Sequence, residues 1–175
     1  GNHTVEVVDS ITTPGSLSGN QSFNWRDLAL LKLKTPVSNT PIKIAPANPS
    51  LQPKDIIIKY GYGSDSSDSL PGYLKSMTGL VQPDNNCYKA MTDFIDFKGM
   101  YEFENFTCFT GYREGATCYG DSGSPATVSI LGEEVLIGVT ESGDQTCSNF
   151  ALSIDIGLDN IEVNDWVKNN TIGLS

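Results

Sequence analysis

The sequence predicts an all-β fold, an antiparallel sandwich or barrel, on three observations. Short segments along the 175 residues are rich in β-branched or aromatic side chains, or alternate in polarity, as strands do. Between them lie stretches of loop composition, such as PGSLSGNQS, PANPSLQP and GSDSSDSLPG. Helical patterning is scarce. The length and the 38% apolar content suit one domain or a small two-lobed domain, and no internal repeat or flexible linker divides it.

Seven strands and one helix are expected. The strands, in chain order, are TVEVV (4–8), LALLKL (28–33), DIIIKY (55–60), YLKSMTGLV (73–81), PATVSI (125–130), EVLIGVT (134–140) and NFALSIDI (149–156). The helix lies near the end of the chain, where Asn164 is the expected cap of the segment DWVKNN. Trp166 and Val167 would then face the core.

The charge balance argues against two kinds of partner. Acidic residues outnumber basic ones by 21 to 11, with no long run of either sign, so neither a nucleic acid nor an anionic membrane surface is expected to bind. No apolar run approaches the ~20 residues that span a bilayer. The first residues, GNHTVEVVDS, lack the regions of a signal peptide, so we expect the chain to begin mid-protein or after processing.

Sequons and cysteines together indicate a secreted, extracellular glycoprotein. Four Asn-x-Ser/Thr triplets begin at Asn2, Asn20, Asn105 and Asn169. The four cysteines are Cys87, Cys108, Cys118 and Cys147. Their spacings form no CxxC or Cys/His pattern, so no metal site is expected, and they allow three pairings into two disulfides.

The segment CYGDSGSP, residues 118–125, has the residue types and order expected of a nucleophile site. Glycines on both sides of Ser122 let the backbone turn sharply, and the N–H groups of Gly120 and Ser122 can then point at a developing oxyanion. The alternatives are a plain Ser/Gly turn and a Gly-x-Ser-x-Gly nucleophile elbow. The elbow is disfavoured because Ser124 replaces the last glycine and no strand-then-helix pattern surrounds it. A serine nucleophile needs a base, most often histidine, and the only histidine is His3.

These residues resemble the chymotrypsin-like (trypsin-like) serine proteases. CYGDSGSPA is similar to the family's nucleophile segment, Cys-x-Gly-Asp-Ser-Gly-Gly-Pro, and NWRDLALLKL (24–33) is similar to its aspartate segment, Asn-Asp-Ile-Ala-Leu-Leu-Lys-Leu. Gly61-Tyr62-Gly63, FTGYREGATC and LIGVTESG resemble further family segments in the same order. The resemblance covers nearly the whole chain. It implies a double β-barrel, with the end of the first barrel and the crossover in 1–45, the second barrel in 46–160, and a C-terminal helix and tail in 161–175.

The resemblance also implies roles for individual residues. Asp27, which alone would suggest a strand-edge charge, becomes the triad carboxylate that orients a histidine for Ser122. Gly120 and Ser122 become the oxyanion donors. Asp121 would pair with the new amino terminus that forms when a zymogen is cleaved. The implied disulfides join Cys118 to Cys147 and Cys87 to Cys108.

The histidine of the triad is expected outside these residues. In the family it precedes the aspartate in a Thr-Ala-Ala-His-Cys context, whereas His3 stands in Asn-His-Thr, and TVEVVDSITTP resembles a strand that follows the histidine. We therefore expect an N-terminal companion chain, or a lost segment, that carries the histidine and the mature N-terminus. A barrel with only the last strands of its neighbour would expose apolar strand edges. This chain alone is expected to be inactive.

Substrate contacts are implied in the same way. Ala116, six residues before the nucleophile, would lie at the base of the primary pocket beside Thr117, and Tyr119 would also contact substrate. Without an acidic counter-charge, an apolar or small neutral P1 residue is favoured, as in chymotrypsin-like or elastase-like enzymes. Gly143 would keep the pocket wall open, and Phe150 would make the pocket shallow.

Two departures from the family pattern leave the function open. Glu141 and Ser142 stand where the family has a serine that touches the catalytic aspartate and a tryptophan that lines the cleft. A carboxylate beside Asp27 would raise one of the two pKa values. Turned inward, Glu141 would impair catalysis, and turned outward it would select basic substrates. Ser124 is a milder change. The sequence thus predicts a secreted serine endopeptidase that acts on protein or peptide substrates without a cofactor, or else an inactive homologue that serves as a binding or adaptor module.

Overall fold

The protein is described by a computed structural model covering 5–13, 27–49, 51–64, 70, 72–94, 105–113, 115–143, 146–149 and 152–171. These residues form nine strands and two helices. In chain order they are β1 (Val7–Thr12), β2 (Ala29–Leu33), β3 (Lys43–Ile44), β4 (Ile56–Gly61), β5 (Lys75–Val81), α1 (Asp84–Phe94), β6 (Phe106–Gly111), β7 (Pro125–Ile130), β8 (Glu133–Gly143), β9 (Leu152–Gly157) and α2 (Ile161–Thr171).

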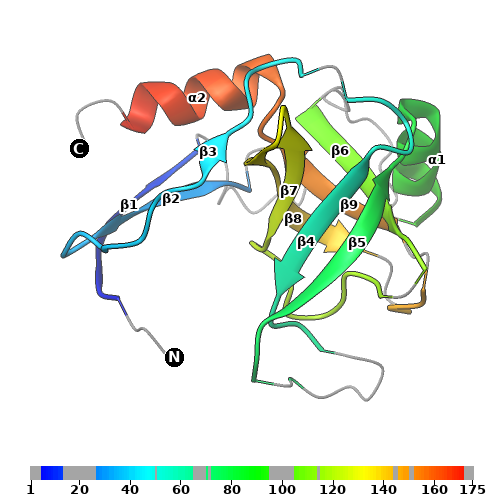
Figure 1. Ribbon diagram of the computed structural model, residues 1–175, viewed down its shortest axis with the longest axis horizontal. Helices are drawn as coiled ribbons and strands as arrows, with labels where there is room; N and C mark the ends of the chain where they lie inside the picture. Colours follow the sequence, from blue (N-terminus) through cyan, green and yellow to red (C-terminus); the bar gives the residue numbers. More distant parts are fainter. Residues whose placement is uncertain are drawn as a thin grey trace.

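Six of the strands close a barrel. The antiparallel pairings run β7-β4-β5-β6-β9-β8, and the pairing of β8 with β7 completes the ring (Figure 1). Closure leaves no unpaired edge among these strands. The short strand β3 adds to the outside of β8 in parallel. The predicted all-β fold, with one complete barrel of the chymotrypsin-like type, is confirmed.

Two apolar clusters lie on the two sides of the barrel wall. The interior is filled by side chains that point inward from several strands, among them Ile57, Phe109, Ala126 and Ile137, each fully buried. On strand β4, Ile57 and Lys59 point inward while Ile56 and Ile58 are exposed, which is the period of two that the sequence predicts. A second cluster joins the outer face of the wall to α2 and to Leu28 beside β2.

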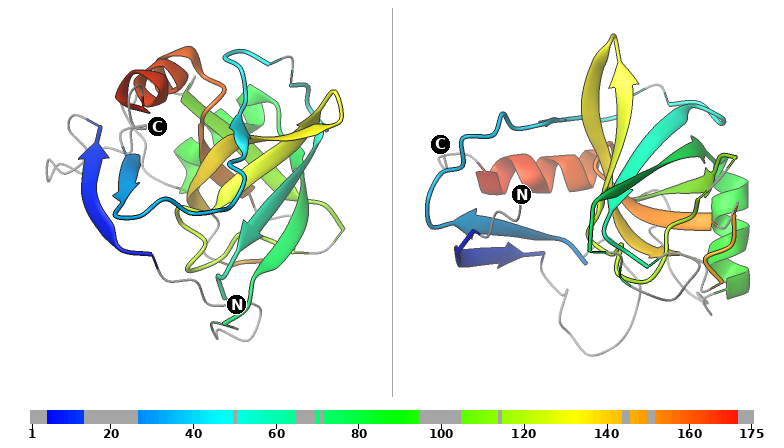
Figure 2. Two further views of the ribbon diagram at one scale, coloured as in Figure 1. Left: turned by 60° about the vertical axis from the view of Figure 1, so that its left-hand side comes forward. Right: turned by 60° about the horizontal axis from the view of Figure 1, so that its bottom comes forward.

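Strands β1 and β2 form a separate two-stranded sheet. Figures 1 and 2 show this sheet projecting from one side of the barrel. Its apolar side chains are largely exposed, including Val8 at 52% and Leu31 at 61%. Strand β1 begins three residues later than the segment 4–8 predicts. The expectation that the strands before the barrel expose apolar surface agrees with this arrangement.

Helix α2 begins earlier than the sequence suggested. The Asn160 side-chain oxygen accepts hydrogen bonds from the N–H groups of Glu162 (2.8 Å) and Val163 (3.3 Å), so Asn160 is the N-cap. The prediction that Asn164 caps this helix was therefore wrong. It lies inside the helix, 1% exposed, and donates to the carbonyl oxygens of Ala45 (3.0 Å) and Leu158 (2.8 Å). Val167 faces the core as predicted.

Helix α1 and strands β3 and β6 have no counterpart among the expected elements. The segment of α1, DNNCYKAMTDF, is mostly polar and contains few strong helix formers. Its first turn is closed by the Pro83 carbonyl, which accepts from the N–H groups of Asn86 and Cys87. A disulfide from Cys87 to Cys108 then ties α1 to β6. No helix in the described ranges is long and apolar enough to cross a membrane.

Candidate active site

The segment 118–124 forms a tight turn at the end of the loop that precedes β7. The N–H of Asp121 donates to the Cys118 carbonyl (3.1 Å), and the N–H of Ser124 donates to the Asp121 carbonyl (2.9 Å). Gly120 and Gly123 have φ values of +90° and +81°, a region that residues with a Cβ avoid. The two glycines that flank the Asp121-Ser122 pair are therefore required by the backbone itself.

Some backbone amides of this turn donate hydrogen bonds, and others donate none to a described group. The Asp121 amide donates within the turn, and the Gly123 amide donates to the Thr140 carbonyl on β8 (2.8 Å). Within the part of the chain that the structure describes, the amides of Gly120 and Ser122 donate to no other group. Two such amides, separated by one residue in a turn, can bind a single negatively charged oxygen.

Ser122 is exposed at the tip of the turn. Its hydroxyl donates to the backbone carbonyl oxygen of Glu141 on β8 at 3.4 Å. A second contact, from the Thr140 amide to the Ser124 carbonyl (2.9 Å), holds the turn against the same strand. The hydroxyl thus lies exposed on the surface beside strand β8.

Asp121 turns away from the surface and packs under the segment Gly61-Tyr62-Gly63. Its carboxylate accepts hydrogen bonds from the amides of Gly63 (2.8 Å) and Cys118 (3.0 Å). A Cβ added at either Gly61 or Gly63 would overlap this carboxylate. The two glycines therefore make room for Asp121, which gives a physical reason for this third matching segment.

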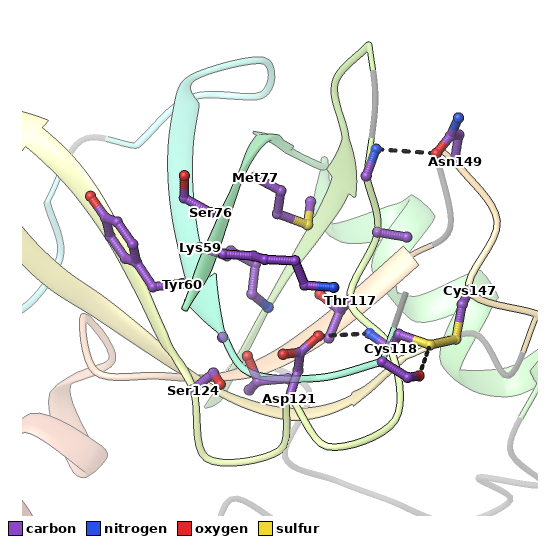
Figure 3. Close-up of a pocket in the computed structure, with 16 residues that line it drawn as sticks. Lys59, Tyr60, Ser76, Met77, Thr117, Cys118, Asp121, Ser124, Cys147 and Asn149 are labelled. Carbon is purple, nitrogen blue, oxygen red and sulfur yellow. Dashed lines mark hydrogen bonds between the residues drawn. A yellow bond between two sulfur atoms is a disulfide. The ribbon is translucent and has the colours of Figure 1, made fainter. Parts of the chain in front are cut away.

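A cavity of about 290 Å³ lies behind the turn. Figure 3 shows Lys59 and Met77 on one side of it and Thr117, Cys118 and Asp121 on the other, with Asp121 joined to Cys118 by a hydrogen bond. Ala116 and Thr140 also line it. The hydroxyls of Thr117 and Thr140 are buried, and no residue that the structure describes forms a hydrogen bond with them. The cavity can hold a polar group that satisfies these hydroxyls.

The structure brings Asp27 to the same part of the molecule as Ser122. Asp27 is exposed, and the next residue, Leu28, packs in the cluster that contains Ile154 of β9. The Asp27 charge acts on Glu141, whose backbone carbonyl receives the Ser122 hydroxyl. The backbone of Glu141 is thus in contact with Ser122, and the charge of Asp27 acts on its side chain.

The side chain of Glu141 is in an unfavourable environment for a charge. Burial, followed by the negative charges of Asp27 and Asp155, raises the pKa of Glu141 to about 7, although the adjacent Ser142 hydroxyl acts in the opposite direction. Its Oε2 atom is buried without a hydrogen-bond partner among the described residues. At neutral pH, a large fraction of this carboxyl group is uncharged.

A β-bulge sets the position of Glu141. Thr140 pairs with Asp155 and Ser142 pairs with Ile154, so Glu141 is the extra residue of β8 opposite β9. Bulges bend a strand and re-aim the side chain of the inserted residue. Strand β8 continues to Gly143, three residues beyond the predicted end, and so carries Glu141, Ser142 and Gly143 past the nucleophile turn.

A buried ion pair beneath Glu141 was not anticipated. The Lys59 ammonium donates to Asp155 Oδ1 (2.5 Å) and to the Ser153 hydroxyl (2.5 Å), and the two charged side chains are 4% and 0% exposed. The available signal was a lysine at an inward position of DIIIKY and an aspartate within NFALSIDI. Neither segment by itself shows that the two charges meet.

The remaining expected residues are distributed as follows. The disulfides join Cys118 to Cys147 and Cys87 to Cys108, as the resemblance implied. Tyr119 is 60% exposed beside Gly120. Asn169 is exposed on α2, whereas Asn105 is buried and donates to Glu162 (3.5 Å), so a glycan at Asn105 requires that contact to break. Outside the described residues lie Asn2, His3, Asn20 and Phe150.

Comparisons with known proteins agree with this geometry. The Trypsin family model matches residues 2–167. A curated trypsin from Saccharopolyspora erythraea is 32% identical over 122 residues, which are 67% of this chain and 48% of that protein, so the chain spans about half the length of this relative. Among solved structures, neuropsin, a serine protease expressed in the limbic system of mouse brain, superposes with a TM-score of 0.75 at 23% identity, covering 95% of this chain and 71% of the other.

Proposed function

Because the chain belongs to the trypsin family of serine proteases, we propose that it forms the part of a secreted serine endopeptidase that carries the nucleophile and the oxyanion site. The observation that carries this proposal is the exposed Ser122 hydroxyl in a turn whose Gly120 and Ser122 amides donate hydrogen bonds to no described group. Removing one oxyanion donor in a comparable site lowers kcat by on the order of 10²–10³.

The reaction is acyl transfer in two steps. The Ser122 oxygen attacks the peptide carbonyl carbon, its proton passes to a histidine, and the two amides stabilise the oxyanion. The histidine then gives that proton to the leaving amine as the peptide C–N bond breaks. Water attacks the acyl-enzyme in the same way and releases the acid, which restores the serine. Asp27 orients the imidazole and stabilises its cation. None of these steps requires a metal or organic cofactor.

A companion polypeptide supplies the histidine. The only histidine of the sequence, His3, stands outside the context that the family uses, and the chain spans 48% of its curated relative. The exposed apolar side chains of β1 and β2, such as Val8 and Leu31, are suitable for burial against further strands of a first barrel. Residues 46–160 then form the second barrel. Both disulfides lie within this chain, so a separate companion would be held without a disulfide bond.

The cavity behind the turn is the proposed receptor for the mature amino terminus of that companion. Asp121 lines it and would pair with the ammonium group, and the buried hydroxyls of Thr117 and Thr140 offer further polar contacts. Substrate preference follows from Ala116, which offers no negative charge to a basic side chain. We therefore assign a preference for an apolar or small neutral P1 residue, as in chymotrypsin-like or elastase-like enzymes.

The second candidate function is an inactive homologue that acts as a binding or adaptor module. One observation favours it: the negative charge of Asp27 acts on the half-buried carboxyl group of Glu141, so an ionised Glu141 would repel the triad carboxylate. Secretion is proposed for either candidate, on the two disulfides and the exposed sequon at Asn169.

Labelling with a fluorophosphonate tests the proposed activity. Intact, activated protein should be labelled at Ser122, and the Ser122→Ala variant should not be. Gel separation under denaturing, non-reducing conditions should release a second polypeptide that carries a histidine. Unlabelled intact material would favour the adaptor, and a single band in labelled material would remove the companion from the proposal.

A further inference from the structure

Buried polar side chains line the cavity of about 290 Å³ behind the nucleophile turn. Three of them are Lys59 on β4, Thr117 in the segment before the turn, and Thr140 on β8. Their exposed fractions are 4%, 6% and 3%, so none of the three side chains is hydrated from the outer surface. Lys59 and Thr117 lie on opposite sides of the cavity (Figure 3). Whatever fills this cavity therefore meets polar groups on more than one wall.

Each of these three side chains has a hydrogen-bond donor that no described residue uses. The hydroxyls of Thr117 and Thr140 form no hydrogen bond within the described ranges. The Lys59 ammonium has three N–H groups, of which one donates to Asp155 Oδ1 and one to the Ser153 hydroxyl, both at 2.5 Å. A buried donor without an acceptor is costly, because it has lost water and gained no partner. An occupant that brings acceptors would remove this cost.

The charged groups of the cavity lining also favour an acceptor over a further donor. Two ammonium groups, those of Lys59 and Lys75, and one carboxylate, that of Asp121, line the cavity. Lys75 forms no ion pair with any described residue. An aliphatic group would exclude water from these donors without replacing its oxygen atoms. A group that carries oxygen atoms matches both the charge and the unused donors.

The buried ion pair has a further role in this arrangement. Asp155 and Ser153 hold the Lys59 ammonium from the interior of the barrel, and the ring of Phe109 lies 5.6 Å from it. These contacts fix the position of the ammonium before any occupant arrives. Its remaining N–H is therefore preorganised for an acceptor in the cavity.

We propose that the first residue of the amino terminus that enters this cavity has an oxygen-bearing side chain, a carboxylate, an amide or a hydroxyl, which accepts hydrogen bonds from Lys59, Thr117 and Thr140. This inference rests on the proposed function, which places the terminus here. The ammonium group of the terminus pairs with Asp121, whose carboxylate has acceptor positions beyond the two that backbone amides use. The side chain beside that ammonium lies in the same cavity as the three donors.

The amino-terminal sequence of the second polypeptide is the direct test. The intact protein is separated under denaturing, non-reducing conditions, and the polypeptide that is released is sequenced by Edman degradation. Its first residue should be Asp, Glu, Asn, Gln, Ser or Thr. Any other first residue overturns the inference and leaves the companion, and with it the proposed function, in place.

The double variant Thr117→Val/Thr140→Val gives a second readout in the intact protein. Valine has nearly the shape of threonine but lacks the hydroxyl. If the hydroxyls bind the occupant, this variant should release the second polypeptide at a lower urea concentration than the wild type, as followed by size-exclusion chromatography. Removal of unpartnered buried hydroxyls is neutral or stabilising instead. Release at the wild-type concentration or above it therefore overturns the proposal.

A matched control for this variant is Thr78→Val. Thr78 lies on β5 and is only half-buried, and its side chain does not line the cavity. The urea concentration at which T78V releases the second polypeptide should equal that of the wild type.

Protein that contains no second polypeptide separates the two proposals. The companion of the proposed function then fails, whereas the cavity is open to a free dipeptide. The dipeptides Asp-Val and Leu-Val have first side chains of similar shape, so their dissociation constants compare oxygen atoms with methyl groups. Isothermal titration calorimetry should show Asp-Val binding more tightly by on the order of tenfold. Equal binding of the two, or tighter binding of Leu-Val, overturns the inference.

Discussion

The carboxylate of Asp121 accepts a hydrogen bond from the backbone amide of Gly63 at 2.8 Å. This contact joins the nucleophile turn to the end of β4, across 58 residues of sequence. The same carboxylate accepts from Cys118 within the turn. The position of the oxyanion amides therefore depends on the space that Gly61 and Gly63 leave for the Asp121 carboxylate, as well as on the turn itself.

Gly63→Ala should abolish the oxyanion site with little effect on the barrel. The new Cβ would overlap the Asp121 carboxylate and force it out of its contact with the turn. We expect kcat/KM to fall by on the order of 10²-fold, the cost of losing a donor. Labelling of Ser122 by a fluorophosphonate is the measurement. An exposed substitution on β7, Ser129→Ala, is the control, and full labelling of G63A would contradict this reading of the turn.

Lys59→Met should destabilise the protein strongly. It leaves Asp155, which is 0% exposed, without its counter-charge, and an unpaired buried charge costs about 3–5 kcal/mol. The double variant Lys59→Met/Asp155→Leu removes both charges and should unfold at a higher denaturant concentration than K59M. Urea unfolding followed by circular dichroism measures both. A double variant no more stable than K59M would show that the pair does not act as a unit.

Glu141→Gln should change how stability depends on pH. The pKa of Glu141 is raised from 4.5 to about 7 on folding, so between these values the folded state holds a proton that the unfolded state has released. Stability from this group is fully present below about pH 4.5 and is lost as pH rises to about 7. The free energy of unfolding of the wild type should therefore fall by about 2 kcal/mol more than that of E141Q between pH 5 and 8.

That comparison isolates Glu141 from a second group. Burial also raises the pKa of Asp159, which adds a change of the same sign to both proteins and cancels in the difference. Parallel stability curves for wild type and E141Q would show that the carboxyl group of Glu141 is not buried in the folded state.

Ala116→Asp should redirect substrate preference. A carboxylate at the proposed base of the primary pocket can pair with a basic P1 side chain, and a hydrogen bond to a charged group is worth about 1.5–3 kcal/mol. The ratio of kcat/KM for P1 Arg over P1 Phe should rise by roughly tenfold or more. Peptides that differ only at P1 measure it, with the exposed Ser129→Asp as the charge-matched control. An unchanged ratio would remove Ala116 from the pocket.

Local features were predictable where one segment carries the whole signal. Strands β2, β4, β5 and β7 follow the alternation of their own residues, within two residues at each end. The positive φ values of Gly120 and Gly123 follow from the turn that places Ser122 between them. Helix α1 and strand β6 were missed, since a disulfide between distant cysteines and pairing to β5 and β9 hold them in place.

By itself, then, the sequence determined the all-β class, the turn that presents Ser122, and the family to which the chain belongs. Only the tertiary structure decided that Lys59 meets Asp155 inside the barrel and that Glu141 is the bulged residue of β8 whose carbonyl accepts from the Ser122 hydroxyl. The physical reason is the separation in sequence between the residues that interact. Strand periodicity and turn geometry arise from neighbours in the chain, whereas the burial of a charge and its partner depends on strands that the barrel brings together across nearly a hundred residues of sequence.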